Sequence, residues 1–323
     1  MSGPTPSAGL GLLFSQATYR APLPTESFEG QTIIVTGANA GLGRDAVRHL
    51  VRLNASRVIL AVRTISKGEE AQAAIEEEYG RKGVMEVWQI DMAKFASVRA
   101  FAQRAQGLDR LDAVLLNAGI WPKKFEMAEG HEATVTTNVI STFLLARLLL
   151  PKLQETSKLT QTIPRMSVVD SDLHKFAKLT TKKDDRIFEG LKKPVTDYDG
   201  RYHDTKLLVV LYGRKLAAQM SKSGQPKVCL NFVNPGWCSS GLNVREGAGV
   251  AVAKRLLQRS QDEGGRMLVD AIALVPRVEE RHGQYINKMR VEKYAAWVYS
   301  KEGEATAEKV WAELNEILEK ESV

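Results

Sequence analysis

The chain has 323 residues, of which 44% are hydrophobic and 26% are charged, and its formal net charge is +7. These fractions are ordinary for a soluble globular protein, which excludes fibrous and disordered classes. Acidic residues are interleaved with lysine and arginine along the chain, so we expect no nucleic-acid-binding patch. No run of apolar residues approaches the length of a membrane-spanning helix, so we expect no transmembrane segment.

Residues 1–28 precede the first predicted strand, and we expect an N-terminal extension that packs on the main domain. The apolar run Gly9–Phe14 is short and has no basic residue before it, so it does not resemble a signal peptide. The alternative is a peripheral membrane contact through Leu10, Leu12, Leu13 and Phe14. The two cysteines, Cys229 and Cys238, are too few for a disulfide framework and suit a reducing compartment, so we expect a cytoplasmic protein.

Predicted strands and helices alternate along the chain. The strands are the apolar or β-branched runs Thr32–Thr36, Arg57–Ala61, Val84–Gln89, Ala113–Asn117, Ile163–Val169 and Val228–Asn234. Helical patterns fall between them, which favours a parallel sheet covered by helices on both faces. Thr306–Lys320 is predicted to form a terminal amphipathic helix whose apolar face includes Val310, Leu314 and Leu318.

A glycine-rich turn, Gly37-Ala38-Asn39-Ala40-Gly41-Leu42-Gly43, joins the first strand to a helical pattern. Glycines allow a tight turn and a close approach to a pyrophosphate, whose charge is met by the amides at the helix N-terminus. The spacing differs from the Gly-x-Gly-x-x-Gly of the general dinucleotide fingerprint. An ordinary strand-to-helix turn is therefore the alternative interpretation.

Tyr202 and Lys206 lie one helical turn apart at the start of an apolar, helix-like segment, Leu207–Met220. A nearby cation favours the phenolate, which lowers the tyrosine pKa toward the range of a general acid. Such a pair suits the protonation of an alkoxide as it forms from a carbonyl. A half-exposed tyrosine beside a solvated lysine is the alternative, because this spacing is common in helices.

The order of the motifs resembles that of one enzyme family. The glycine turn after Thr36 is followed by Asn117-Ala118-Gly119, Asn138, Ser171, Tyr202-x-x-x-Lys206 and Asn234-Pro235-Gly236. Together they resemble the short-chain dehydrogenase/reductase family, in its NAD(P)-dependent form, from about Glu29 to the C-terminus. The stretches Val58–Arg63, Lys67–Glu69 and Asn234–Cys238 are similar to retinol-dehydrogenase-like and fungal secondary-metabolism members.

The resemblance implies a fold and an assembly. The fold is a single Rossmann-type, doubly wound parallel sheet of about seven strands with helices on both faces, the seventh strand lying near Gln284–Asn287. Residues 29–323 would form one catalytic domain. A homodimer or homotetramer would be built on the helices after the fourth and fifth strands. Arg147 interrupts the apolar run Phe143–Leu150 there, which leaves a monomer open.

The resemblance also assigns a cofactor site to four parts of the chain. The glycine turn, with Gly37, Asn39, Gly41, Leu42 and Gly43, would border the phosphates. Asp91 and Met92 would contact the adenine, and Asn117, Ala118 and Gly119 the adenosine ribose, whereas Asp91 as a helix cap is the alternative. Pro235 and Gly236 would lie against the nicotinamide amide, although such a turn needs no ligand.

The choice between NAD and NADP rests on the end of the second strand. Folds that bind NAD place an acidic side chain there for the ribose hydroxyls, whereas a 2′-phosphate needs a cation. The sequence has no acid at this point, and Arg63 and Lys67 are positioned to flank a phosphate. We therefore expect NADP(H) and no metal site. Two solvated charges on a loop are the alternative.

The catalytic set implied by the resemblance is Asn138, Ser171, Tyr202 and Lys206. Tyr202 would give the proton, Lys206 would lower its pKa and hold the cofactor ribose, and Ser171 would stabilise the carbonyl oxygen. Asn138 would hold a water that relays protons, or else bond backbone inside its helix. Ser167 would be a buried structural hydroxyl, and His174 and His203 loop or surface residues.

The sequence departs from the family pattern at Asp170, which replaces the first of two serines. Asp170 and Asp172 bracket Ser171, and an anionic site would disfavour an oxyanion unless both carboxylates point away. Alternation along the strand favours that orientation. The substitution also favours an alternative function, a cofactor-binding scaffold or a protein with a non-redox role such as cyclisation or epimerisation.

Three aromatic residues, Trp121, Tyr198 and Trp237, indicate a substrate pocket near the predicted catalytic residues. With the segment Leu173–Arg201 and the loop Cys238–Ala253, they suggest a fairly large, apolar or aromatic small-molecule substrate. We therefore predict an NADPH-dependent carbonyl reductase or alcohol dehydrogenase, of the kind used in secondary-metabolite biosynthesis.

Overall fold

The computed structural model describes residues 16, 18–225, 227–239, 242 and 258–322. Its strands are β1 (Thr32–Thr36), β2 (Arg57–Val62), β3 (Met85–Gln89), β4 (Ala113–Leu116), β5 (Met127–Ala128), β6 (His131–Glu132), β7 (Arg165–Val169), β8 (Cys229–Asn234), β9 (Tyr285–Asn287) and β10 (Arg290–Glu292). Its α-helices are α2 (Gly41–Arg52), α3 (Ile65–Tyr79), α4 (Phe95–Gln106), α5 (Ala133–Val135), α6 (Ser141–Thr160), α7 (Ile187–Leu191), α8 (Tyr198–Lys222), α10 (Gln261–Ala271) and α11 (Lys301–Glu321). A π-helical turn spans Thr136–Ile140, and 3₁₀ helices span Asp172–Phe176, Thr180–Lys183, Val278–Arg281 and Ala296–Tyr299.

Within the described residues the central sheet has eight strands, in the order β10-β9-β8-β7-β4-β1-β2-β3. Neighbouring strands are parallel except for β9 and β10, which pair antiparallel. The prediction of a doubly wound parallel sheet is confirmed, and the seven predicted strands are present with shifts of a residue or two at their ends. The eighth strand, β10, was not predicted.

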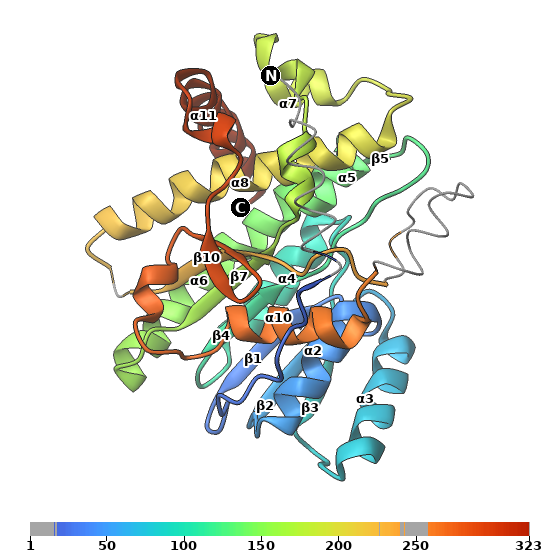
Figure 1. Cartoon of the computed structure of the whole chain (residues 1–323), viewed down its shortest axis with the longest axis vertical. Coiled ribbons are helices and arrows are strands. Elements are labelled where there is room, and N and C mark those ends of the chain that lie inside the picture. The colour runs from blue at the N-terminus through green and yellow to red at the C-terminus, as the bar shows by residue number, and fades with distance from the viewer. Residues whose placement is uncertain (1–15, 17, 226, 240–241, 243–257, 323) are drawn as a thin grey trace.

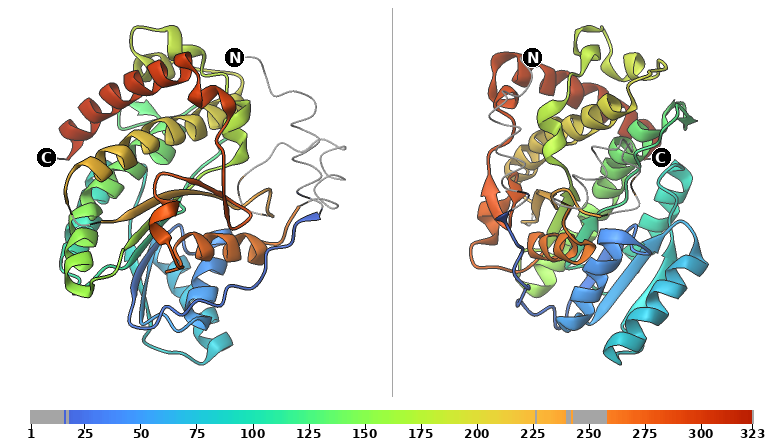
Figure 2. Two further views of the ribbon diagram at one scale, coloured as in Figure 1. Left: turned by 60° about the vertical axis from the view of Figure 1, so that its left-hand side comes forward. Right: turned by 45° about the vertical axis from the view of Figure 1, so that its right-hand side comes forward.

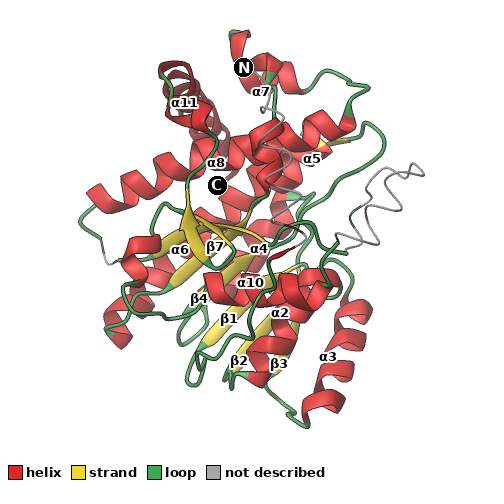
Figure 3. Cartoon of the chain, viewed as in Figure 1, coloured by secondary structure: helices red, strands yellow, loops and turns green. Residues whose placement is uncertain are grey.

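Helices cover both faces of this sheet (Figure 1, Figure 3). In β1, Ile33 and Val35 pack into a core with α2, α3 and α10, whereas Ile34 packs on the opposite side with α4, α6 and α8. This alternation follows from the two-residue period of a strand, and it buries β1 on both faces. The central strand is therefore held rigidly between two apolar layers.

The C-terminal helix α11 lies alongside α8 on the outer side of one helical layer (Figure 2). Trp311 of α11 stacks on Tyr212 of α8, with ring centroids 5.0 Å apart. Asn315 Oδ1 accepts hydrogen bonds from Tyr212 Oη at 2.9 Å and from Arg147 Nη1 of α6 at 3.1 Å. Arg147, which interrupts the apolar pattern of α6, thus binds a helix of its own chain.

One helical stretch, Ala133–Thr160, is long and apolar enough by length and composition to cross a membrane. It comprises α5, the π-helical turn and α6, and 83% of its most apolar window is buried inside the fold. Burial of this kind is expected of a core helix that packs against a sheet and two neighbouring helices.

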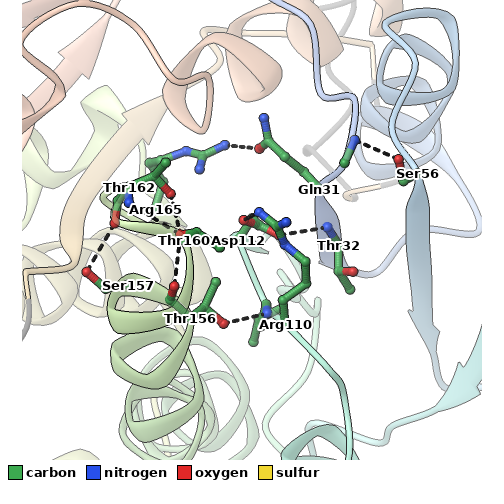
Figure 4. A network of polar contacts seen from close by, with 12 residues as sticks. Gln31, Thr32, Ser56, Arg110, Asp112, Thr156, Ser157, Thr160, Thr162 and Arg165 are labelled. Atoms are coloured by element: carbon green, nitrogen blue, oxygen red, sulfur yellow. Dashed lines mark hydrogen bonds and ion pairs between the residues drawn. The ribbon is translucent and has the colours of Figure 1, made fainter.

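A polar network ties together the amino ends of the central strands (Figure 4). Asp112, just before β4, accepts a hydrogen bond from Thr32 N of β1 at 2.9 Å and binds the Arg110 guanidinium. Arg165, the first residue of β7, is 1% exposed, and it donates to Gln31 Oε1 and to Ile272 O. The polar side chains at this edge therefore hold the strands in place. Open α/β sheets bind their ligands at the opposite edge, where the strands have their carboxyl ends.

The part of the extension that the structure describes contacts the domain at several residues. Phe28 is fully buried in the core, Pro24 O accepts from Arg52 Nη2, and Ala21 O accepts from Arg266 Nη1. Leu10, Leu12, Leu13 and Phe14, considered above for a membrane contact, lie outside the described residues.

Candidate active site

The glycine turn after β1 lies at the carboxyl edge of the sheet, where strand order reverses between β1 and β4. Gly37 and Gly41 have positive φ angles of 66° and 57°, which glycine adopts without strain. A Cβ added at Gly43 would lie closer than 3.0 Å to Gly37 O and Asn117 Nδ2, so the turn packs tightly there. By contrast, a Cβ at Gly41 would meet nothing within 4 Å.

The turn leads into the N-terminus of α2, which is suited to bind an anion. Its N-cap residue, Ala40, makes no capping hydrogen bond from its side chain, and the first turn contains no acidic residue. The amides and the positive end of the helix dipole therefore face the space beside Gly41. Asn39 and Leu42, predicted to border the phosphates, are half-buried at the same turn.

Thr36 and Asn117 fasten the ends of β1 and β4 to each other. Thr36 Oγ1 accepts from Asn117 N and Ala118 N, both at 2.9 Å, while Asn117 Nδ2 donates to Thr36 O at 2.8 Å. Asn117 thus stabilises the switch point itself. Ala118 is half-buried and Gly119 exposed beside it, so their backbone forms one wall of the crevice.

Arg63 follows β2 directly, and Lys67 lies on the first turn of α3. Both side chains are exposed, and neither has an ion-pair partner among the residues that the structure describes. Gly68 lets α3 approach the sheet closely, because a Cβ there would lie closer than 3.0 Å to side-chain atoms of Val87 and Val62. Two cations therefore flank the carboxyl end of β2, where a 2′-phosphate would bind.

Asp91 follows β3, and its carboxylate accepts a hydrogen bond from a nearby backbone amide. Asp91 Oδ1 accepts from Ala93 N at 3.0 Å, and its backbone amide donates to Ser97 Oγ at 2.9 Å. Asp91 is not the cap of α4, whose N-cap residue is Lys94, so this oxygen stabilises the turn before the helix. Met92 is 6% exposed and packs in the core, so only its backbone is available to an adenine.

Asn138 lies in the π-helical turn before α6 and is 4% exposed. Its Oδ1 accepts from Ile120 N at 2.8 Å, and its Nδ2 donates to Ile120 O at 2.9 Å. The Asn138 side chain thus binds the segment after Gly119 to the π-helical turn in which Asn138 lies. Asn138 Nδ2 also lies 3.4 Å from Thr205 Oγ1, which connects it to α8.

Tyr202 and Lys206 lie on α8, as their spacing predicted, and both are buried. The Tyr202 ring stacks on Trp121, with centroids 4.2 Å apart and planes at 5°, and Lys206 Nζ lies 5.5 Å from the Tyr202 ring centroid. Lys206 Nζ donates to Val169 O, the last residue of β7, at 2.7 Å. The pair is therefore anchored from α8 onto the central sheet.

The expected depression of the Tyr202 pKa by Lys206 is wrong for this structure. Burial raises the pKa of Tyr202 well above its usual value, and the Asp170 charge raises it further. Burial lowers the pKa of Lys206, while Asp170 opposes that change. Desolvation is thus the largest cause of both pKa shifts.

Ser171 follows β7 at the carboxyl edge and is half-buried. Its Oγ accepts from Leu173 N at 3.2 Å, so it caps the 3₁₀ helix Asp172–Phe176. Its carbonyl accepts from His174 Nδ1 at 2.7 Å. Ser167, four residues earlier, is fully buried and donates to Asn231 Oδ1 at 2.7 Å, which confirms its structural role.

The carboxylates that bracket Ser171 are held by different partners. Asp170 is 1% exposed and lies beside His174, whereas Asp172 accepts from Asn234 Nδ2 at 2.8 Å and from Tyr285 Oη at 3.1 Å. The prediction of a loop or surface position is wrong for His174, which is 2% exposed. Aromatic rings of Tyr285 and Tyr294, from the C-terminal part of the chain, cover it.

The turn after β8 closes the other side of the crevice. Pro235 is buried, Gly236 has a φ of 76°, and Gly236 N donates to Asn234 Oδ1 at 3.0 Å. Trp237, in this turn, is half-buried, as is Tyr198 at the start of α8. Most of the loop Cys238–Ala253, predicted to cover the site, lies outside the described residues.

The residues that could bind a dinucleotide lie one after another along the carboxyl edge of the sheet. Gly41 borders an open cradle at a helix N-terminus, Arg63 and Lys67 supply positive charge, and Tyr202 and Lys206 lie on the opposite side of the switch point. The residues present therefore fit NADP(H). Among the described residues, no group of three or more His, Cys, Asp or Glu side chains is placed to hold a metal ion.

Comparisons with known proteins identify close relatives. A short chain dehydrogenase family profile matches residues 31–161. The short-chain dehydrogenase anuD of Penicillium roqueforti is 42% identical over 322 residues, which cover 97% of this chain and 84% of anuD. The short chain dehydrogenase atnD of Emericella nidulans is 41% identical over 295 residues, which cover 89% of this chain and 93% of atnD.

Solved structures share the fold at lower identity. An uncharacterized protein from Mycobacterium paratuberculosis superposes with a TM-score of 0.69 at 24% identity, covering 92% of this chain and 98% of that protein. A short chain dehydrogenase from Burkholderia cenocepacia, solved in complex with NADP, superposes with a TM-score of 0.59 at 18% identity, covering 80% of this chain and 96% of that one. At these identities the likeness concerns the fold alone.

Proposed function

The chain belongs to the short-chain dehydrogenase/reductase family and is thus an oxidoreductase, and on this premise we propose that it reduces ketones with NADPH. The observation that carries the proposal is the arrangement of Ser171, Tyr202 and Lys206 at the carboxyl edge of the sheet, across the switch point from the glycine turn. That edge is where open α/β sheets bind their ligands.

The reduction needs a hydride at the carbonyl carbon and a proton at the carbonyl oxygen. NADPH supplies the hydride when it is bound. Tyr202 donates the proton to the oxygen as the alkoxide forms, and the Ser171 hydroxyl donates a hydrogen bond to the same oxygen. Lys206, held by Val169 O, keeps a positive charge on the same helix as the phenol, 5.5 Å from its ring centroid. The product is the alcohol.

NADPH is preferred over NADH in this proposal because of the charges after β2. Arg63 and, from the first turn of α3, Lys67 would hold a 2′-phosphate by their positive charges. No acidic residue stands at this strand end to bind the two ribose hydroxyls of NADH. The Burkholderia structure was itself solved with NADP.

The substrate proposed is a fairly large apolar or aromatic ketone. Trp121 lies flat against Tyr202, so an aromatic surface adjoins the proton donor. Trp237 adds aromatic surface after β8, and Tyr198 begins α8, the helix that carries Tyr202. We propose a step of fungal secondary-metabolite biosynthesis, since anuD and atnD are short-chain dehydrogenases of fungi, and the cytoplasm as its place.

One observation favours a second candidate function. The Asp170 charge beside the site opposes formation of an oxyanion and raises the pKa of Tyr202. A cofactor-binding protein with a non-redox role, such as cyclisation, epimerisation or a scaffold function, would tolerate this charge. Binding of NADPH without oxidation across a panel of aromatic ketones would favour this candidate over the reductase.

Titration of the protein with NADPH and NADH, followed by cofactor fluorescence, tests the cofactor proposal. We expect tighter binding of NADPH, and we expect Arg63→Ala to raise the Kd for NADPH by about tenfold or more while changing the Kd for NADH little. Lys82→Ala, which removes an exposed charge near the amino end of β3, is the control. Equal affinities for the two cofactors in the wild type would refute the preference.

A further inference from the structure

Gln16 of the N-terminal extension binds the backbone of Trp237, 221 residues later in the chain. Its Nε2 donates to Trp237 O at 2.6 Å, and its Oε1 accepts from Trp237 N at 3.2 Å. Gln16 is 7% exposed. The side-chain amide thus satisfies both polar groups of one residue, as the peptide of a neighbouring strand does in a sheet.

The residues around Trp237 leave this turn little freedom. Trp237 O also accepts from Arg259 N at 2.9 Å, and Ser239 N donates to Arg259 O at 2.9 Å. A Cβ added at Gly236 would lie closer than 3.0 Å to Arg259 Nη1 and 3.2 Å from Gln16 Oε1. Gln16 and Arg259 therefore pack directly against the turn after β8.

Hydrogen bonds connect this turn to the candidate catalytic residues. Gly236 N donates to Asn234 Oδ1 at 3.0 Å, and Asn234 Nδ2 donates to Asp172 Oδ2 at 2.8 Å. Asp172 directly follows Ser171. If the turn moved, Asn234 and Asp172 would therefore move with it, and Ser171 is the neighbour of Asp172 in the chain.

The position of β8 indicates which half of a dinucleotide this turn faces. The glycine turn follows β1 and the two free cations follow β2, so the adenosine half belongs on that side of the switch point. β8 lies on the other side, beyond β4 and β7. The turn Pro235–Trp237 therefore faces the nicotinamide half and the substrate.

We propose that Gln16 is a positioning residue that holds the turn Pro235–Trp237 in the shape required by the nicotinamide half of the cofactor. This inference rests on the proposed function, because it takes NADPH as the ligand. It gives Gln16 a role in cofactor binding rather than in the stability of the fold alone. It also predicts that Gln16 contributes to the binding of the nicotinamide half of the cofactor and not to the binding of the adenosine half.

Two probes separate these effects in the full-length protein. NADPH contains both halves, whereas 2′-phospho-ADP-ribose lacks only the nicotinamide ring. Gln16→Met keeps the length of the side chain and removes both hydrogen bonds. We expect it to raise the Kd for NADPH about tenfold and to leave the Kd for 2′-phospho-ADP-ribose unchanged.

Gln16→Glu keeps an acceptor for Trp237 N but places a carboxylate against Trp237 O, so we expect at least as large a rise in the Kd for NADPH. Thr25→Ala, a change at an exposed position of the same extension, is the control and should alter neither Kd. Thermal unfolding of each variant shows whether the fold is intact.

An unchanged Kd for NADPH in Gln16→Met would overturn the inference. An equal loss for both probes, with a lowered Tm, would overturn it too, because Gln16 would then only stabilise the fold. If the wild type and Thr25→Ala bound neither probe, the proposed function would fail, and the inference with it.

Discussion

Asp170 and His174 face each other inside the protein, with Asp170 Oδ2 3.3 Å from His174 Nδ1 and neither side chain exposed. His174 Nδ1 donates to Ser171 O, and His174 Nε2 accepts from Ala295 N at 3.1 Å, so the hydrogen bonds require a neutral imidazole. The Asp170 oxygens meet no hydrogen-bond donor in the part of the chain that is described. A neutral His174 leaves the Asp170 charge to act on Tyr202 and Lys206, whose pKa values it raises.

Asp170→Asn should therefore shift the pH dependence of reduction. The Asp170 charge raises the pKa of Tyr202 and of Lys206, so its removal lowers both. Because Tyr202 must carry its proton to donate it, the rate should decline at a lower pH in the variant. The measurement is kcat/KM for NADPH-dependent reduction against pH, with the exposed change Asp185→Asn as control. The prediction would be refuted if kcat/KM of the variant declined at the same pH as that of the wild type, or at a higher pH.

Gly41→Ala should weaken cofactor binding far more than it destabilises the fold. Gly41 and Gly80 both have positive φ, at 57° and 64°, and an added Cβ meets nothing within 4 Å at either. Each substitution should therefore cost about 1–2 kcal/mol of left-handed strain. Only Gly41 borders the cradle at α2, so only its variant should bind NADPH at least tenfold more weakly. Urea unfolding and NADPH titration of both variants give the comparison, and equal NADPH affinities would contradict the assignment.

The protein should be a monomer of 35.7 kDa in solution. The resemblance places a family interface on the helices after the fourth and fifth strands, which are α6 and α8 here. In this chain α11 packs there, through Trp311 on Tyr212 and Asn315 on Arg147. Sedimentation velocity over a range of concentrations measures the mass. A stable dimer would contradict this prediction and would show that two copies associate through a surface other than the one that α11 covers.

Asp204→Asn should change how stability depends on pH. Burial raises the pKa of Asp204 to about 6, against hydrogen bonds from Leu179 N and Lys178 N. Since this exceeds the usual value of 3.8, the native state binds the proton more tightly than the unfolded chain, and stability falls as the pH rises from about 4 to 6. Asparagine keeps the acceptor for both amides without the charge.

The free energy of unfolding from urea titrations at about pH 4 and pH 7 tests this, because the difference between variant and wild type isolates the one group. The variant should gain stability relative to the wild type as the pH rises. A difference that does not vary with pH would show that folding does not raise the pKa of Asp204.

The sheet could be predicted because its strands are short apolar runs, buried on both faces. β10 escaped prediction because it follows a two-residue turn in which Lys288 and Met289 adopt positive φ angles of 53° and 59°. Such turns usually carry Asn-Gly, and this sequence gives no such signal. The turn depends on the tertiary pairing of β9 with β10 rather than on local preference.

The motifs located the glycine turn, Ser171 and the pair on α8, because each is a local pattern tied to a strand end or a helix. Burial of His174 could not be predicted, since its polar neighbours indicate a loop and the covering rings of Tyr285 and Tyr294 come from more than a hundred residues away. The contact of Gln16 with Trp237 has no sequence pattern at all.

The central claim is that Tyr202 donates the proton in an NADPH-dependent reduction. Tyr202→Phe keeps the ring that stacks on Trp121 and removes only the hydroxyl. The decisive measurement is NADPH oxidation with a panel of aromatic ketones, together with NADPH affinity, for the wild type and this variant. The account predicts turnover by the wild type, and at least a hundredfold lower kcat with unchanged NADPH binding in Tyr202→Phe, which is roughly the contribution of a general acid. Equal turnover by the two proteins would contradict it.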